Sequence, residues 1–181
     1  FNRLGAATIS SDAIVHDLLD REPMASRIAE RWGDAVESDG TVDRDAVGAR
    51  VFNDPDELQW LEQMVHPLVR DELAVWFSGL DVDTEFAVVE VPLLFEGEMS
   101  AHFDTTVAVV AGEKVRAQRA RERGHVGIEG REGRQFSQAK KAERAQHVVS
   151  NDGTPEQLQQ RLGELLERLG FTVKVIPSNI D

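Results

Sequence analysis

The chain has 181 residues, of which 41% are hydrophobic, 29% charged and 6% aromatic, a composition typical of one soluble globular domain. No apolar stretch approaches the roughly 20 residues that cross a bilayer, and the lack of cysteine excludes disulfides, thiolate zinc sites and a cysteine nucleophile. The net charge of −13 argues against broad electrostatic binding to nucleic acid. We therefore expect a cytoplasmic protein that binds neither membranes nor nucleic acid.

Short apolar runs alternate with helix-like stretches along the chain. The runs typical of buried parallel strands cover residues 7–10, 86–91, 105–110 and 147–150. Helical patterns occupy residues 13–19, much of 21–80, and 155–169, where Gly170 ends the last one. Strands separated by helices predict an open parallel α/β sheet with helices on both faces. An alternating run at 171–176 would add an edge strand that Pro177 ends.

Two intervals are too long to be simple crossovers. The first, about 21–84, predicts a helical insertion with a turn at Asp39–Gly40 and a helix start at Asp54–Pro55. The second, about 112–144, favours a mobile flap because it contains four glycines, namely Gly124, Gly127, Gly130 and Gly133. We expect one domain over 1–181, with its core at about 1–20, 85–111 and 145–181.

The basic residues are concentrated in this second interval. From Lys114 to Arg144 there are ten bases against four acids, a local charge of +6, which leaves −19 for the rest of the chain. Because arginine side chains match phosphate oxygens two at a time, the segment suits a compact polyanion such as the phosphate chain of a nucleotide. The alternative is a solvated basic surface.

Asp12 directly follows the first predicted strand. Ligands of open α/β sheets bind at the carboxyl ends of the strands, so Asp12 is a candidate general base. The alternative is an N-cap of the next helix. His16 lies four residues on, on the same helical face, where we expect a partly buried packing histidine.

Other segments allow both a structural and a functional interpretation. His66–Leu68 is expected to end one helix and start another, because Pro67 suits a first helical position. Leu93–Phe95 lies beyond the strand predicted at 86–91 and is either core or the wall of a pocket for an apolar ligand surface. Asn151–Gly153 follows the last predicted strand and is either a turn or a loop near a bound base.

Five blocks of the sequence stand in the order and spacing of the dephospho-coenzyme A kinase family. They cover 4–16, 39–55, 61–69 (with His-Pro-Leu), 91–96 (Val-Pro-Leu-Leu-Phe-Glu) and 135–153, the last including Lys141, Arg144–Ala145 and Asn151–Gly153. Any one block would be a weak signal, but five in register over roughly 1–169 make the resemblance specific.

The resemblance implies a P-loop kinase fold related to nucleoside monophosphate kinases, with a five-stranded parallel core, a helical substrate-binding insertion and an arginine-bearing lid that closes over ATP. The implied reaction transfers the γ-phosphate of ATP to the ribose 3′-hydroxyl of dephospho-coenzyme A, the last step of coenzyme A synthesis. Mg²⁺ would be held mainly by ATP and the family's phosphate loop. The implied partners are therefore the small molecules ATP and dephospho-coenzyme A.

Residue roles follow from the same resemblance. Asp12 falls on the catalytic carboxylate that takes the hydroxyl proton. The positions facing dephospho-coenzyme A are His66, Leu93, Leu94, Phe95 and Glu96. The positions facing ATP are Arg119, Arg144, Asn151 and Gly153. No residue of the chain is predicted to bind a metal directly.

The sequence departs from the family pattern at its start. Ser10 and Glu90 stand where aspartate is usual, and no Gly-x-x-x-x-Gly-Lys-Ser/Thr occurs. The family's phosphate loop and the central strand before it would precede Phe1, so we expect the chain as written to be inactive and poorly stable. Two alternative functions are a non-catalytic protein that binds coenzyme A or a nucleotide, and an enzyme similar to the nucleoside monophosphate kinases.

Overall fold

The computed structural model describes residues 1–35, 41–97, 99–122 and 135–173. The chain divides into two compact units. The sheet unit comprises residues 1–8, 84–88 and 92–181, and the helical unit comprises residues 9–83 and 89–91. β1 (Ala7–Ser10) pairs with β2 (Ala87–Glu90), and each strand has residues in both units.

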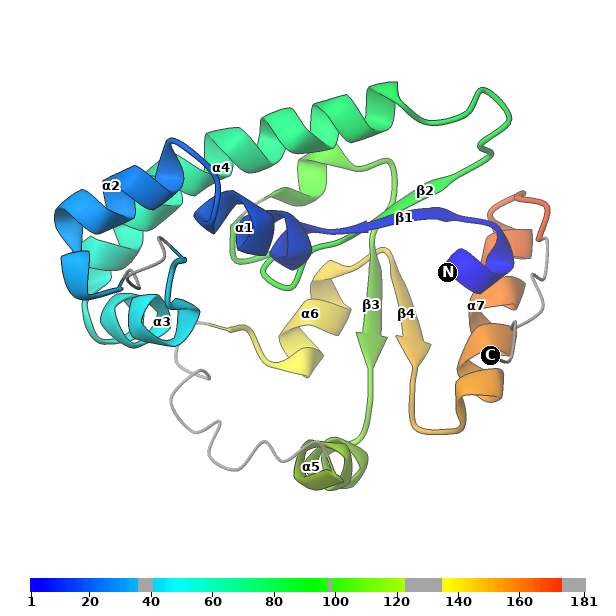
Figure 1. The fold of residues 1–181 in the computed structure, drawn as a ribbon. Helices are drawn as coiled ribbons and strands as arrows, with labels where there is room; N and C mark the ends of the chain where they lie inside the picture. Colours follow the sequence, from blue (N-terminus) through cyan, green and yellow to red (C-terminus); the bar gives the residue numbers. More distant parts are fainter. Residues whose placement is uncertain (36–40, 98, 123–134, 174–181) are drawn as a thin grey trace. The chain divides into compact units, whose positions relative to one another are not determined.

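The sheet unit is organised around two parallel strands. β3 (Val107–Val110) pairs with β4 (His147–Ser150) in a register that sets Val107 beside His147 and Val110 beside Ser150. α6 (Gln138–Arg144) packs beside β3, and α7 (Pro155–Arg168) packs beside β4 (Figure 1). α5 (Glu113–Glu122) begins three residues after β3. The short 3-10 helices of this unit are η1 (Asn2–Leu4) and η3 (Met99–His102).

The core of the sheet unit lies between β4, η1 and α7, and its buried residues are Leu4, Val149, Leu162, Leu165 and Leu166. The amphipathic pattern of α7 explains this packing, since three buried leucines recur on one face. Thr154 and Gln157 form a reciprocal capping box at the start of α7, and Gly170 adopts a positive φ just after its end. These signals fix both ends of the helix.

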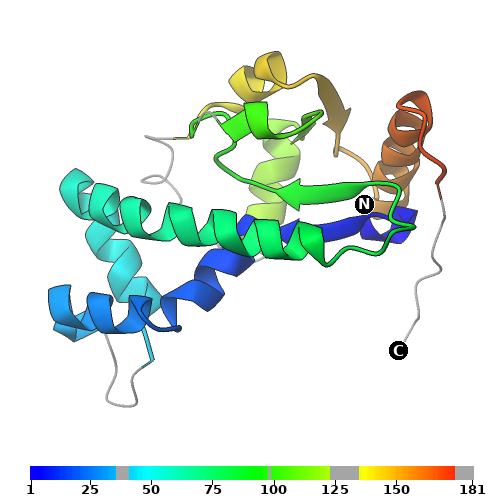
Figure 2. The same ribbon diagram turned by 90° about the horizontal axis from the view of Figure 1, so that it is seen from above.

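The helical unit holds α1 (Ser11–Leu19), α2 (Met24–Arg31), η2 (Gly33–Ala35), α3 (Arg44–Asn53) and α4 (Pro55–Ser78) (Figure 2). Its apolar core includes Met24, Ile28 and Trp32, which are 2% exposed or less. Asp43 and Asp54 begin α3 and α4, and each accepts two backbone N–H groups of the helix that it caps.

The expected strands and helices are largely confirmed. β1 and β4 have the predicted bounds, β2 and β3 lie within the predicted runs, and α4 begins at Asp54–Pro55 as expected. The edge strand is wrong for residues 171–173, which form none, while 174–176 lie outside the described residues. So do the predicted turn at Asp39–Gly40 and the flap glycines. Within the described part of the chain, no helix is long and apolar enough to span a bilayer.

The helix break predicted at His66–Leu68 is wrong, because α4 runs without interruption from Pro55 to Ser78 with Pro67 inside it. Pro67 has no N–H to donate to the carbonyl of Gln63, and such a proline costs about 3 kcal/mol. Val65, Val69 and Leu73 are buried at four-residue spacing on the same helix. Burying three such side chains contributes about 1.5–3 kcal/mol each, which exceeds the cost of the proline.

Replacing this interior proline should therefore stabilise the protein. Pro67→Ala restores one helical hydrogen bond and should raise the free energy of unfolding by about 1–3 kcal/mol. Pro55→Ala is the matched control, since proline at a first helical position removes no helical bond, and it should change stability by less than about 0.5 kcal/mol. Chemical denaturation of both variants measures the difference, and equal effects would contradict the assigned cost of Pro67.

Candidate functional site

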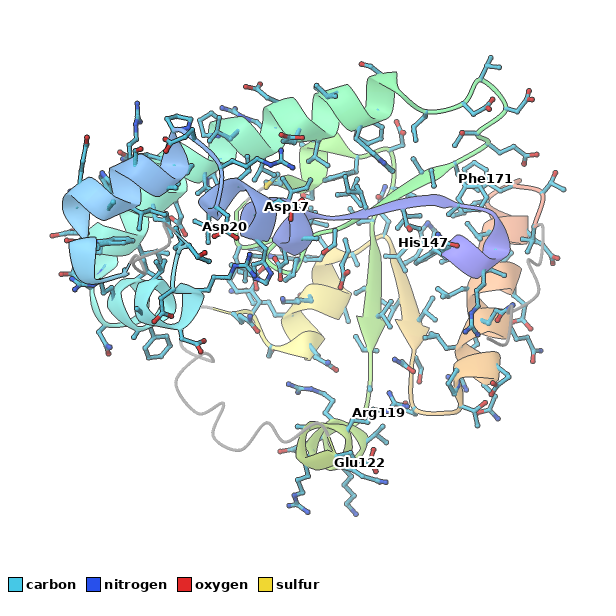
Figure 3. All side chains as sticks on the ribbon, viewed as in Figure 1. Asp17, Asp20, Arg119, Glu122, His147 and Phe171 are labelled. Carbon is cyan, nitrogen blue, oxygen red and sulfur yellow. The ribbon has the colours of Figure 1, made fainter. Side chains whose placement is uncertain are left out.

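A loop at the carboxyl end of β4 is held by an arginine from α5. Arg119 donates from one terminal nitrogen to the carbonyl of Asn151 (2.7 Å) and from the other to the carbonyl of Gly153 (2.9 Å). Figure 3 shows Arg119 at the carboxyl ends of β3 and β4. Two parallel donors on one planar group fix the loop more closely than a lysine would. The structure thus brings together three residues that the sequence assigned to the ATP side.

Asp152 ties the same loop to the end of β3. Its Oδ1 accepts the backbone N–H of Gly112 (2.5 Å), and its Oδ2 accepts the hydroxyl of Ser150 (2.5 Å). These two hydrogen bonds hold the pKa of the Asp152 carboxyl below its usual value, with the bond from Gly112 contributing most and the bond from Ser150 next. The charges of Arg161 and Arg119 contribute less. The loops after both parallel strands are therefore joined to each other.

The absence of a side chain at Gly153 leaves room for the cap at the start of α7. A Cβ atom there would lie 1.8 Å from Oε1 of Gln157. That oxygen accepts the backbone N–H of Thr154 at 3.0 Å as half of the capping box. A side chain at position 153 would therefore displace the glutamine and disturb the helix cap.

A second loop of the sheet unit, Pro92–Glu96, is bonded to α6. Arg144 donates to the carbonyl of Phe95 (3.2 Å), and Lys141 donates to the carbonyl of Pro92 (2.6 Å). Leu93 is 42% exposed, Leu94 is half-buried and Phe95 is 7% exposed. Phe95 is therefore part of the core, whereas Leu93 presents apolar surface outward.

Asp12 lies in the first turn of α1 in the helical unit, and its side chain is exposed. The N-cap interpretation of Asp12 is wrong, because Ser10 occupies the cap position two residues earlier and makes no side-chain cap bond. His16 is also exposed, so the expectation of a packing histidine is wrong as well. The exposed side of α1 thus carries a carboxylate and an imidazole at four-residue spacing. His66 is exposed on α4 of the same unit.

Sequence reasoning missed an arginine beside α1. Arg44 of α3 donates to Oδ2 of Asp20 (2.5 Å) and to the carbonyl of His16 (3.3 Å). Oδ1 of Asp20 accepts the N–H of Val42 at 3.3 Å. Figure 3 labels Asp20 near the end of α1. The only available signal was the place of Arg44 in a block that matches the family.

No metal centre is formed by protein side chains in the described ranges, where no three His, Cys, Asp or Glu residues gather closely enough to hold an ion. Cationic groups are instead contributed by Arg119, Lys141 and Arg144, all in the sheet unit. Such groups suit the binding of phosphate oxygens.

Parallel strands, flanking helices and strand-end loops held by helix arginines define a kinase-like α/β protein of the P-loop class. The family model described as dephospho-CoA kinase matches residues 1–157. The dephospho-CoA kinase of Protochlamydia amoebophila is 34% identical over 173 residues, which is 92% of this chain and 85% of that protein. The dephospho-CoA kinase of Chlamydia pneumoniae is 32% identical over 170 residues, or 91% and 84% of the two chains. The chain belongs to the dephospho-CoA kinase family, as the five sequence blocks predicted.

Solved structures agree with this assignment. The crystal structure of TT1252 from Thermus thermophilus is 31% identical, with a TM-score of 0.76 over 91% of this chain and 85% of that one. A dephospho-CoA kinase from Campylobacter jejuni is 23% identical, with a TM-score of 0.66 over 93% and 87% of the two chains, and supports the fold. The family's reaction is the last step of coenzyme A biosynthesis.

The low pKa of Asp152 predicts how acid affects stability. A carboxyl whose pKa is lower in the folded state stabilises the protein above the unfolded-state pKa of about 4, and this stabilisation is lost as the pH falls through the folded-state pKa. Asp152→Asn should therefore lower the thermal midpoint at pH 7, and the deficit should shrink below about pH 4. The control is Asp104→Asn, at an exposed aspartate of the same unit. Melting curves measured across pH that show a constant deficit for Asp152→Asn would contradict this role.

Proposed function

We propose that the enzyme expressed from its natural gene transfers the γ-phosphate of ATP to the ribose 3′-hydroxyl of dephospho-coenzyme A. The observation that carries this proposal is the loop Asn151–Gly153, held by Arg119 at the carboxyl ends of two parallel strands in a member of the dephospho-CoA kinase family. Ligands of open α/β sheets bind at such strand ends.

The sheet unit supplies the ATP side of this proposal. Asn151 and Gly153 border the adenine, and Arg119 and Arg144 neutralise phosphate oxygens. A guanidinium has five N–H groups, and the loop carbonyls of Asn151 and Gly153 accept one from each terminal nitrogen of Arg119. Donors therefore remain for a phosphate while the loop stays fixed. Arg144 likewise gives one terminal nitrogen to the carbonyl of Phe95.

The acceptor side combines a base with apolar surface. Asp12 is exposed on the first turn of α1 and takes the proton of the 3′-hydroxyl as it attacks phosphorus. The first turn of a helix suits a carboxylate, since the helix dipole favours negative charge there. His66 and Leu93–Glu96 contact dephospho-coenzyme A, with the helical insertion 21–84 carrying His66.

Mg²⁺ bound to ATP would supply neutralisation of the charge on the transferred phosphoryl group. Phosphoryl transfer needs mainly positioning and charge neutralisation from the protein. The exposed carboxylate of Asp12 orients the attacking hydroxyl as it takes the proton, and the loop-bound guanidinium of Arg119 neutralises phosphate charge.

Removing the proposed base should slow turnover without weakening binding. In the enzyme expressed from its natural gene, Asp12→Asn should lower kcat by about 10²–10⁴-fold and change the KM for either substrate by less than about threefold. Asp17→Asn, at a second exposed aspartate of α1, is the matched control and should stay within about twofold of wild type (Figure 3). Steady-state kinetics with ATP and dephospho-coenzyme A test both, and near-normal turnover in Asp12→Asn would contradict the role of base.

Replacing the guanidinium of Arg119 with an ammonium should weaken the use of ATP. Arg119→Lys keeps the charge but cannot hold two carbonyls in fixed geometry, so kcat/KM for ATP should fall about tenfold or more. Arg121→Lys, at an exposed arginine of the same helix, should have little effect. If both variants lose activity to the same extent, the effect comes from the general charge of α5 and the specific role of Arg119 is wrong.

A further inference from the structure

One side chain of α6 makes two contacts with the loop Pro92–Glu96. Nζ of Lys141 donates to the carbonyl of Pro92 at 2.6 Å and lies 3.2 Å from Oε1 of Glu96. The same oxygen accepts the backbone N–H of Phe136 at 2.7 Å. Both ends of the loop are thus bonded to the segment that leads into α6 or to α6 itself.

The ion pair is largely removed from water. The side chains of Glu96 and Lys141 are 11% and 22% exposed. Burial disfavours the charged carboxyl, but the N–H groups of Phe136 and of Glu96 itself, with the ammonium of Lys141, together hold the pKa of Glu96 below its usual value. Oε2 of Glu96 is buried and has no hydrogen-bond partner among the described residues. The carboxylate therefore depends on what binds Oε1, and removing Lys141 would leave a poorly compensated buried charge.

Two contacts of α6, made by Gln138 and Lys140, do not involve this loop and can be tested separately. Gln138 accepts the backbone N–H of Ala111 at 2.9 Å. The ammonium of Lys140 lies 3.5 Å from the ring centre of Phe136. Lys140 and Lys141 are therefore adjacent lysines with different partners, one an aromatic ring and the other the loop.

We propose that Glu96 and Lys141 are positioning residues that hold the loop Pro92–Phe95 in the shape that binds the acceptor substrate. This inference rests on the proposed function, in which Leu93–Glu96 contacts dephospho-coenzyme A, and it assigns the buried carboxylate of Glu96 to the loop, leaving contact with the substrate to the rest of that segment. Lys141 fixes the first residue of the loop through the Pro92 carbonyl and the last through Glu96, so the exposed side chain of Leu93 is presented from a backbone anchored on both sides. The ion pair sets affinity for the acceptor and leaves ATP binding unchanged.

Calorimetric titration of the protein with dephospho-coenzyme A, and separately with ATP, tests the proposal without requiring turnover. Lys141→Met should weaken dephospho-coenzyme A binding about tenfold and change ATP binding by less than about twofold. Lys140→Met is the matched control and should bind both ligands as wild type does. Equal weakening for both ligands, or equal effects of the two lysine variants, would overturn the proposal.

Two further variants separate positioning from a general loss of structure. Lys141→Arg retains a donor for Pro92 and Glu96 and should restore binding to within about threefold of wild type. In the double variant Glu96→Gln/Lys141→Met, the buried charge is gone and the introduced amide oxygen still accepts the N–H of Phe136, so it should bind better than Lys141→Met alone. A double variant that binds no better than Lys141→Met, or no recovery in Lys141→Arg, would contradict the ion pair as the cause.

Hydrogen exchange distinguishes failure of this inference from failure of the proposed function. The N–H of Gly97 donates to the carbonyl of Leu93, and that of Met99 donates to the carbonyl of Leu94. Both amides should exchange faster in Lys141→Met than in wild type or Lys140→Met. Unchanged exchange would overturn the positioning role whatever the protein binds. Faster exchange in Lys141→Met, together with a wild-type protein that does not bind dephospho-coenzyme A, would instead overturn the proposed function.

Discussion

The nucleotide half of the proposed site depends on one contact between distant parts of the chain, the guanidinium of Arg119 on the carbonyls of Asn151 and Gly153. Its planar fork gives the loop a shape that the loop's own backbone bonds do not specify. Asp152 connects the same loop to Gly112, just after β3, by accepting its backbone N–H. The capping box of Thr154 and Gln157 connects the loop to α7. The parallel pairing of β3 and β4 brings these groups to one edge of the sheet.

Secondary structure was predictable where its causes are local. Continuous β-branched and apolar runs predicted β2, β3 and β4, because strands covered on both faces are rich in such residues. Aspartate followed by proline marked the start of α4, since the carboxylate caps two free N–H groups and proline suits the first helical position. The helix break predicted at Pro67 was wrong because proline disfavours the interior of a helix locally, whereas the burial of Val65 and Val69 stabilises a continuous α4.

The chemistry of individual side chains was predictable only in part. Five matching blocks were enough for the family, and the position after a strand was enough to select Asp12 as a candidate base. The partners of those side chains were not predictable, because Lys141 meets Pro92 across 49 residues and Arg119 meets Asn151 across 32. His16 was expected inside and is exposed, since helical spacing identifies a common face without telling whether another element covers it.

The most direct test of the central claim is the identity of the phosphorylated product. The enzyme expressed from its natural gene would receive Mg²⁺, γ-labelled ATP, dephospho-coenzyme A and AMP together, and phosphorus NMR with mass spectrometry would locate the transferred group. We expect the label on the ribose 3′-hydroxyl of dephospho-coenzyme A, at least about 100-fold above that on AMP. Transfer to AMP would contradict the proposal in favour of a nucleotide kinase. Binding of dephospho-coenzyme A with transfer to neither acceptor would contradict it in favour of a non-catalytic binding protein.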